Sequence, residues 1–64
     1  MSAFTVYRID PPGAKRIPVG TVVERRQAER GSNFAGLIRL AIARYKRSPQ
    51  EKYQVDFRSL RVEF

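Results

Sequence analysis

One amphipathic segment limits what this chain can fold into more than any other part of its sequence. Residues 33–47 read NFAGLIRLAIARYKR, and six apolar side chains recur there at helical spacing: Phe34, Leu37, Ile38, Ala41, Ile42 and Tyr45. At about 100° per residue these positions span an arc of roughly 140°, which is typical of a helix face that packs on a core. The sequence therefore predicts a helix at about 33–47 whose apolar face is covered by the flanking segments.

Two strand patterns precede this helix. Residues 3–9 are rich in β-branched and aromatic side chains, and residues 17–26 begin in the same way. We expect a basic loop at 10–16 between them, because its prolines and glycine interrupt a strand. Gly20 predicts a bulge or a close backbone approach in the second strand. The period of two predicts that four side chains of that strand share a face: Ile17, Val19, Thr21 and Val23.

A third strand pattern follows the helix. The sequence at 48–51 matches a capping box and predicts a short helical turn. Residues 53–64 then alternate apolar and polar side chains, but the phase slips by one near Ser59, which a bulge or a tight turn would explain. A helical phase also fits these residues, although the β-branching and the alternation favour a strand.

The segment 22–30 has a second interpretation as a helix. Residues 21–24 match a capping box, and Gly31 suits the position after a helix end. A helix there would make a helix-turn-helix with 34–47 as the recognition helix, yet the outer face of that helix offers few hydrogen-bonding groups. We therefore favour a strand that continues to about residue 25.

Together these patterns predict one small α+β domain over residues 1–64. Its order is β-β-α-β, with a mainly antiparallel three-stranded sheet packed on one helix. A chain of this length buries only about 60% of its unfolded surface, so its core is small. The sequence has no cysteine for a disulfide, and we expect either a compact monomer or a dimer that shares its core.

Composition also limits the chemistry that we expect. The chain lacks cysteine and histidine, its six acidic residues are scattered, and no nucleophile or phosphate-loop motif occurs. We therefore predict no enzymatic activity, no metal site and no cofactor. The first ten residues do not resemble a signal peptide, and no apolar run is long enough to span a membrane, so we expect a cytoplasmic protein.

The charge of the chain points to an anionic partner. The chain contains thirteen Lys and Arg residues and six Asp and Glu residues, which gives a net charge of +7. Such a balance favours nucleic acid or another polyanion, although solubility alone would also explain it. Arginines gather just before the predicted helix, whose first-turn amides favour an anion. The predicted phosphate-binding residues are Arg25, Arg26, Arg30, Ser32, Asn33 and Arg39. The alternative is a capped loop whose arginines pair with Glu24 and Glu29.

Two further surfaces are candidates for binding. Tyr7 and Tyr53 would form a stacking platform for bases if they shared an exposed sheet face, whereas Tyr45 lies on the apolar stripe and fits the core better. Gly36, Leu40 and Ala43 form a patch of mostly small residues on the helix. This patch predicts a second class of function, a protein-interaction or structural module that forms homodimers, unless arginine stems cover Leu40.

Overall fold

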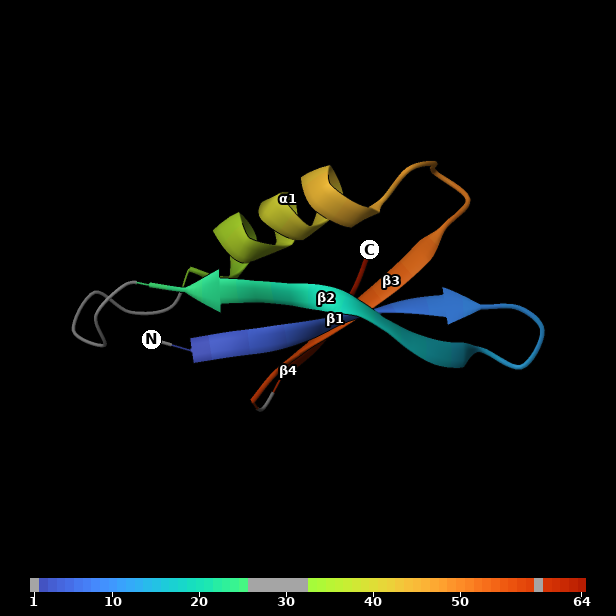
Figure 1. Cartoon of the computed structure of the whole chain (residues 1–64), viewed down its shortest axis with the longest axis horizontal. Coiled ribbons are helices and arrows are strands. Elements are labelled where there is room, and N and C mark those ends of the chain that lie inside the picture. Colours follow the sequence, from blue (N-terminus) through green and yellow to red (C-terminus); the bar gives the residue numbers. More distant parts are fainter. Residues whose placement is uncertain (1, 26–32, 59) are drawn as a thin grey trace.

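The fold is described here from a computed structural model, which covers residues 2–25, 33–58 and 60–64. Its elements are β1 (Ser2–Asp10), β2 (Lys15–Glu24), α1 (Phe34–Tyr45), β3 (Lys52–Phe57) and β4 (Leu60–Glu63) (Figure 1). The α+β class, the predicted helix and the antiparallel sheet are confirmed within the described residues. The predicted strand count is wrong, because the sheet has four strands in the order β-β-α-β-β along the chain.

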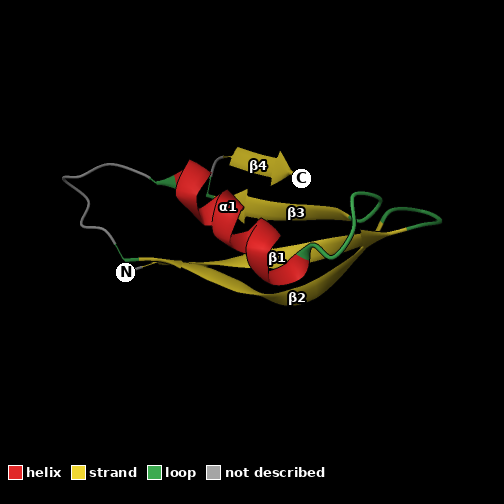
Figure 2. Cartoon of the chain, turned by 90° about the horizontal axis from the view of Figure 1, so that it is seen from above, coloured by secondary structure: helices red, strands yellow, loops and turns green. Residues whose placement is uncertain are grey.

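The sheet consists of two hairpins joined at its centre. The strand order is β2-β1-β3-β4, and each neighbouring pair is antiparallel. One hairpin consists of β1 and β2, and the other consists of β3 and β4. The two hairpins join at the centre of the sheet, where β1 pairs with β3. Figure 2 shows that α1 lies against one face of the sheet, between β2 at one edge and β4 at the other. No helix of the described residues covers the opposite face (Figure 1).

The fourth strand explains the phase slip in the C-terminal segment. Phe57 pairs directly with Leu60, so the chain reverses between them, and Arg58 has a φ of +29°. Such a reversal shifts the apolar phase by one residue while both strands keep their apolar sides on the same face. Of the two expected causes, the tight turn is confirmed and the bulge is wrong. The helical interpretation of 53–64 is also wrong, since β3 and β4 occupy most of this segment. Of the alternative helix at 22–30, residues 22–24 belong to β2, whereas 26–30 lie outside the described residues.

The core lies between α1 and one face of the sheet. Its buried apolar residues are Phe4, Val6, Val22, Leu37, Ala41, Tyr53, Val55 and Phe57. An aromatic cluster anchors the start of α1, because the Phe34 ring stacks on Phe57 at 4.3 Å and Phe4 meets Phe57 edge-on at 5.0 Å. The helix begins and ends near the predicted residues, and most of its stripe packs on the core. Ile42 differs, because it is 40% exposed.

The bulge expected at Gly20 is present in β2. The β1–β2 register shifts between Val6 and Tyr7, so that Gly20 pairs with Val6 and Pro18 with Tyr7. The extra residue changes which side chains face the core: Val22 is fully buried and Thr21 is exposed. The prediction that four alternate side chains share one face is therefore wrong, because a bulge breaks the period of two. These side chains are Ile17, Val19, Thr21 and Val23.

The described residues that flank α1 form neither a side-chain N-cap nor a second helix. Asn33 holds the N-cap position, but its side chain makes no capping hydrogen bond. Residues 48–51 do not form the predicted short helix. They form an isolated turn, in which the Glu51 amide donates to the Ser48 carbonyl at 3.2 Å. The Glu51 carboxylate then accepts from the Arg47 amide at 2.7 Å. Among the helices of the described residues, none is long and apolar enough to cross a membrane.

Candidate functional site

The structure describes three of the six predicted phosphate-binding residues. Arg25 follows the end of β2, Asn33 precedes α1, and Arg39 lies on the exposed side of the helix. The other three lie outside the described residues: Arg26, Arg30 and Ser32. The candidate site is therefore built from the end of β2 and from α1.

A carboxylate of the chain already lies at the start of the helix. The Asn33 amide donates to Glu24 Oε2 at 3.0 Å, so Glu24 satisfies one of the donors near the positive end of the helix dipole. The Asn33 side chain turns toward Gly36, where a Cβ would overlap its amide. Glu24 thus provides the first anion at this helix end, and an external phosphate there would adjoin a carboxylate.

A hollow of about 580 Å³ lies between the end of β2 and α1. Its lining residues are Val23, Glu24, Arg25, Asn33, Gly36, Leu37, Leu40 and Arg44. Arg25 lines the hollow from the end of β2, and Gly36 and Arg44 line it from α1. Arg44 was not among the predicted residues, although its spacing of four residues from Leu40 and eight from Gly36 places all three on one helix flank.

Arg25 and Arg39 of the predicted phosphate-binding residues share one surface with the predicted self-association patch. Gly36 and Leu40 line the same hollow as Arg25, and helical spacing places Ala43 and Arg39 next to them. Leu40 and Ala43 are exposed, as are the arginines around them. We call this surface the α1 outer face and define it as Arg25, Gly36, Arg39, Leu40, Ala43 and Arg44.

The α1 outer face carries positive charge that is not neutralised locally. Residues 33–47 contain no acidic side chain. In the part of the chain that the structure describes, Arg25, Arg39 and Arg44 form no ion pair. The ion pairs are elsewhere: Arg8 with Asp10 at 2.7 Å, and Asp56 with Arg16 at 2.7 Å and Arg61 at 2.9 Å. An anion that approaches Arg39 or Arg44 therefore meets arginines without an ion pair among the described residues, while the Glu24 carboxylate disfavours an anion at the end of β2.

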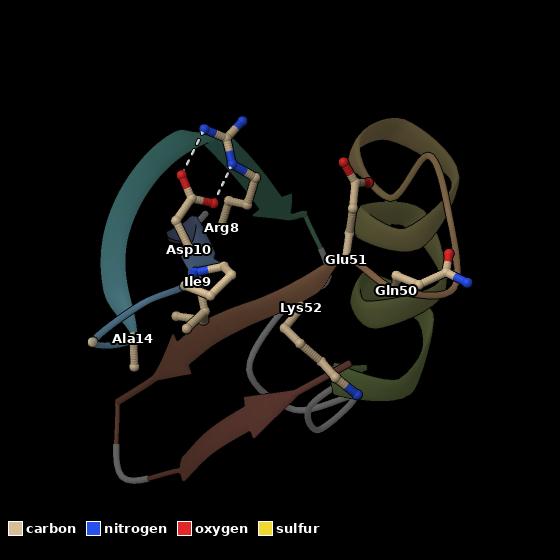
Figure 3. A pocket seen from close by; sticks show the side chains of 9 residues that line it. Arg8, Ile9, Asp10, Ala14, Gln50, Glu51 and Lys52 are labelled. Carbon is tan, nitrogen blue, oxygen red and sulfur yellow. Dashed lines mark hydrogen bonds and ion pairs between the residues drawn. The ribbon is translucent and has the colours of Figure 1, made fainter.

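A second hollow, of about 560 Å³, lies at the other end of the sheet beside the β1–β2 hairpin. Figure 3 shows Arg8 and Asp10 joined by hydrogen bonds on the β1 side and Glu51 on the side of β3. The hydrogen bond from Arg8 lowers the pKa of Asp10, and the Arg47 amide lowers the pKa of Glu51. Because these charges already have partners, this hollow is the weaker candidate for ligand binding.

The tyrosines do not form the stacking platform that the sequence suggested. Tyr53 is only 3% exposed, burial raises its pKa, and its hydroxyl donates to the Tyr45 carbonyl at 2.6 Å. Tyr7 pairs with Gln54 in the register and lies on the opposite sheet face, where the Arg16 guanidinium stacks on its ring at 3.9 Å. Tyr45 packs against the core, as expected.

Metal ligands and known relatives give no further guide to the site. Within residues 2–25, 33–58 and 60–64, no group of three acidic, histidine or cysteine side chains is placed to hold a metal ion. The chain has no significant match among protein-family models, curated proteins or solved structures.

Proposed function

We propose that this protein binds nucleic acid through its phosphates and that the α1 outer face is the contact surface. The observation that carries the proposal is the concentration of arginines on a helix face without carboxylates. Arg39 and Arg44 flank the small side chain of Ala43, so a phosphate backbone can approach the helix there, whereas the Asn33 side chain already lies against Gly36. Arginine suits this role because its planar fork donates two hydrogen bonds to one phosphate.

Four other predicted contacts extend this surface in the proposal. They are Arg26, Arg30, Ser32 and Asn33, which lie in the sequence between β2 and α1 or at its start. Contacts of this kind are to phosphate, so they give affinity with little sequence preference.

The same charges argue against the second function, self-association through this face. Two copies that joined their Gly36, Leu40 and Ala43 patches would bring Arg39 and Arg44 of one copy toward those of the other. Like charges at an interface disfavour association, whereas a polyanion removes the repulsion. Charge therefore favours an anionic partner over a second copy at this surface.

The test is the salt dependence of binding to a labelled mixed-sequence duplex and to the matching single strand, measured by fluorescence anisotropy. For a duplex, the logarithm of the binding constant falls with the logarithm of the salt concentration by about 0.9 for each phosphate contact. The double variant Arg39→Gln/Arg44→Gln should therefore lower this slope by about 1.8.

The matched control removes two positive charges at the other end of the sheet. Lys15 and Lys52 are exposed beside the β1–β2 hairpin, and Lys15→Gln/Lys52→Gln should leave the slope nearly unchanged. An equal loss of slope in both variants would assign the binding to net charge rather than to the α1 outer face. No binding at low salt would overturn the proposed function.

A further inference from the structure

The two edges of the sheet differ in how well they are protected from another strand. In β2, Pro18 lacks a backbone donor and the adjacent bulge interrupts the ladder, so this edge is a poor template for pairing. β4 has no proline, and its register with β3 is regular from Gln54–Glu63 to Phe57–Leu60. The exposed edge of β4 is therefore open for strand addition.

The hydrogen bonds to β3 determine which groups of β4 point outward. Tyr53 and Phe64 donate to each other's carbonyls at 2.8 and 3.0 Å, so they form a hydrogen-bonded pair. Such pairs alternate along an antiparallel ladder, so Val62 and Leu60 also direct their backbone toward β3. The amides and carbonyls of Arg61 and Glu63 consequently point away from the sheet.

These outward groups match those of a second β4 in one antiparallel register. With a two-fold axis at Val62, Arg61 of each copy lies opposite Glu63 of the other, and each such pair exchanges backbone hydrogen bonds. Arg61 already bonds Asp56 and Glu63 already bonds Gln54 within each copy, and across the axis the two side chains add cross-strand pairs of opposite charge, which stabilise a sheet. Registers that align Arg61 with Arg61, or Glu63 with Glu63, place like charges opposite each other and are disfavoured.

The apolar side of β4 fits the same register. Val62 would lie opposite Val62, and Leu60, which is 49% exposed, opposite Phe64 of the second copy. Pairing at β4 would therefore cover apolar side chains that the single chain leaves partly exposed.

We propose that this protein forms a two-fold dimer through antiparallel pairing of its β4 edges, which gives a continuous sheet with four strands from each copy. The partner is a second copy because the edge is complementary to itself in backbone, charge and apolar side chains. This inference does not depend on the proposed nucleic-acid binding, since the interface and the α1 outer face lie at different edges of the sheet.

The test is sedimentation equilibrium of the full chain, whose monomer mass is 7.4 kDa, over a wide range of concentration. The wild type should reach twice this mass. Arg61→Glu and Glu63→Arg should each weaken the dimer at least tenfold, because each places like charges across the interface. An equimolar mixture of the two variants should restore it, since each charged pair is then again of opposite sign.

A further variant tests the interface without the charged pairs. Leu60→Lys places a charge at the apolar side of the edge and should also weaken the dimer, while circular dichroism checks that each variant folds. A wild type that stays at 7.4 kDa at millimolar concentration would overturn the proposal. A dimer that resists these variants but is lost in Leu40→Lys would overturn it in favour of the α1 outer face. A monomer whose β4 edge instead binds an added extended peptide would also overturn it.

Discussion

Gly20 is the residue at which the sheet and the end of the helix meet most closely. The Tyr45 ring lies over it, so a Cβ at this position would overlap the ring and the hydroxyl. The Tyr45 hydroxyl also donates to the Thr21 carbonyl at 3.2 Å. Glycine is needed here for space, whereas Gly13 is needed for its φ of +85°.

Gly20→Ala should lower the free energy of unfolding by about 1–3 kcal/mol, because the added methyl group displaces the Tyr45 ring. Urea unfolding followed by circular dichroism would measure the change. In a Tyr45→Leu background the same substitution should cost clearly less, since the ring is gone. An equal cost in both backgrounds would mean that the backbone of β2, rather than Tyr45, excludes a side chain.

Asp56 links the two halves of the sheet by charge. Its hydrogen bonds with Arg16 and with Arg61 lower the pKa of its carboxyl below the ordinary value. A carboxyl whose pKa is lower in the folded state stabilises the fold above its unfolded pKa of about 3.9. This contribution is lost as the pH falls through the folded pKa.

The free energy of unfolding should therefore decrease as the pH falls below about 4. Asp56→Asn should be less stable than the wild type at pH 7 and should lose less stability on acidification. Urea unfolding at several pH values would check both effects, and added salt should weaken them because the pairs are partly exposed. Parallel pH profiles for the two proteins would exclude this role.

At the scale of elements, a turn holds α1 to β3. The Tyr53 hydroxyl donates to the Tyr45 carbonyl at 2.6 Å and lies 3.2 Å from Oε1 of Glu51, which accepts from the Arg47 amide. These hydrogen bonds replace the capping that the sequence predicted for a second short helix. They tie the last turn of α1 to the first residues of β3.

Tyr53→Phe should therefore destabilise the protein by about 1 kcal/mol, because it leaves the Tyr45 carbonyl without this donor. Amide hydrogen exchange should increase most at residues 45–47 and less in the β1–β2 hairpin. Tyr7→Phe is the matched control, since no hydrogen bond of the Tyr7 hydroxyl occurs among the described residues. Uniform exchange increases in Tyr53→Phe would show a general loss of stability instead of a local one.

The elements differ in how well their sequences predicted them. The apolar period located α1 because the helix repeats its pattern over three turns. Beyond Gly20 the period of two no longer predicts which side chains of β2 face the core, since one bulged residue exchanges the two faces of a strand. Near Ser59 a bulge and a reversal produce the same slip of phase, so only the pairing of Phe57 with Leu60 distinguishes them.

For the whole molecule, the candidate site was predictable only in part. Arg25, Arg39 and the small residues of α1 were found from their charge and spacing, but as two separate surfaces. Arg44 was missed, because the sequence does not show that Arg25 and the end of β2 lie beside it. Charge composition predicts an anionic partner, whereas the surface that meets it depends on how β2 and α1 are placed together.

The sheet order also has a consequence for how the chain folds. Each hairpin joins neighbouring strands through a short connection, whereas the central pairing of Val6 with Val55 closes a loop that contains β2 and α1. Closing a longer loop costs more chain entropy, and non-local pairing slows folding. The middle of this sheet should thus assemble after its outer hairpins, with α1 stabilising the centre as it closes.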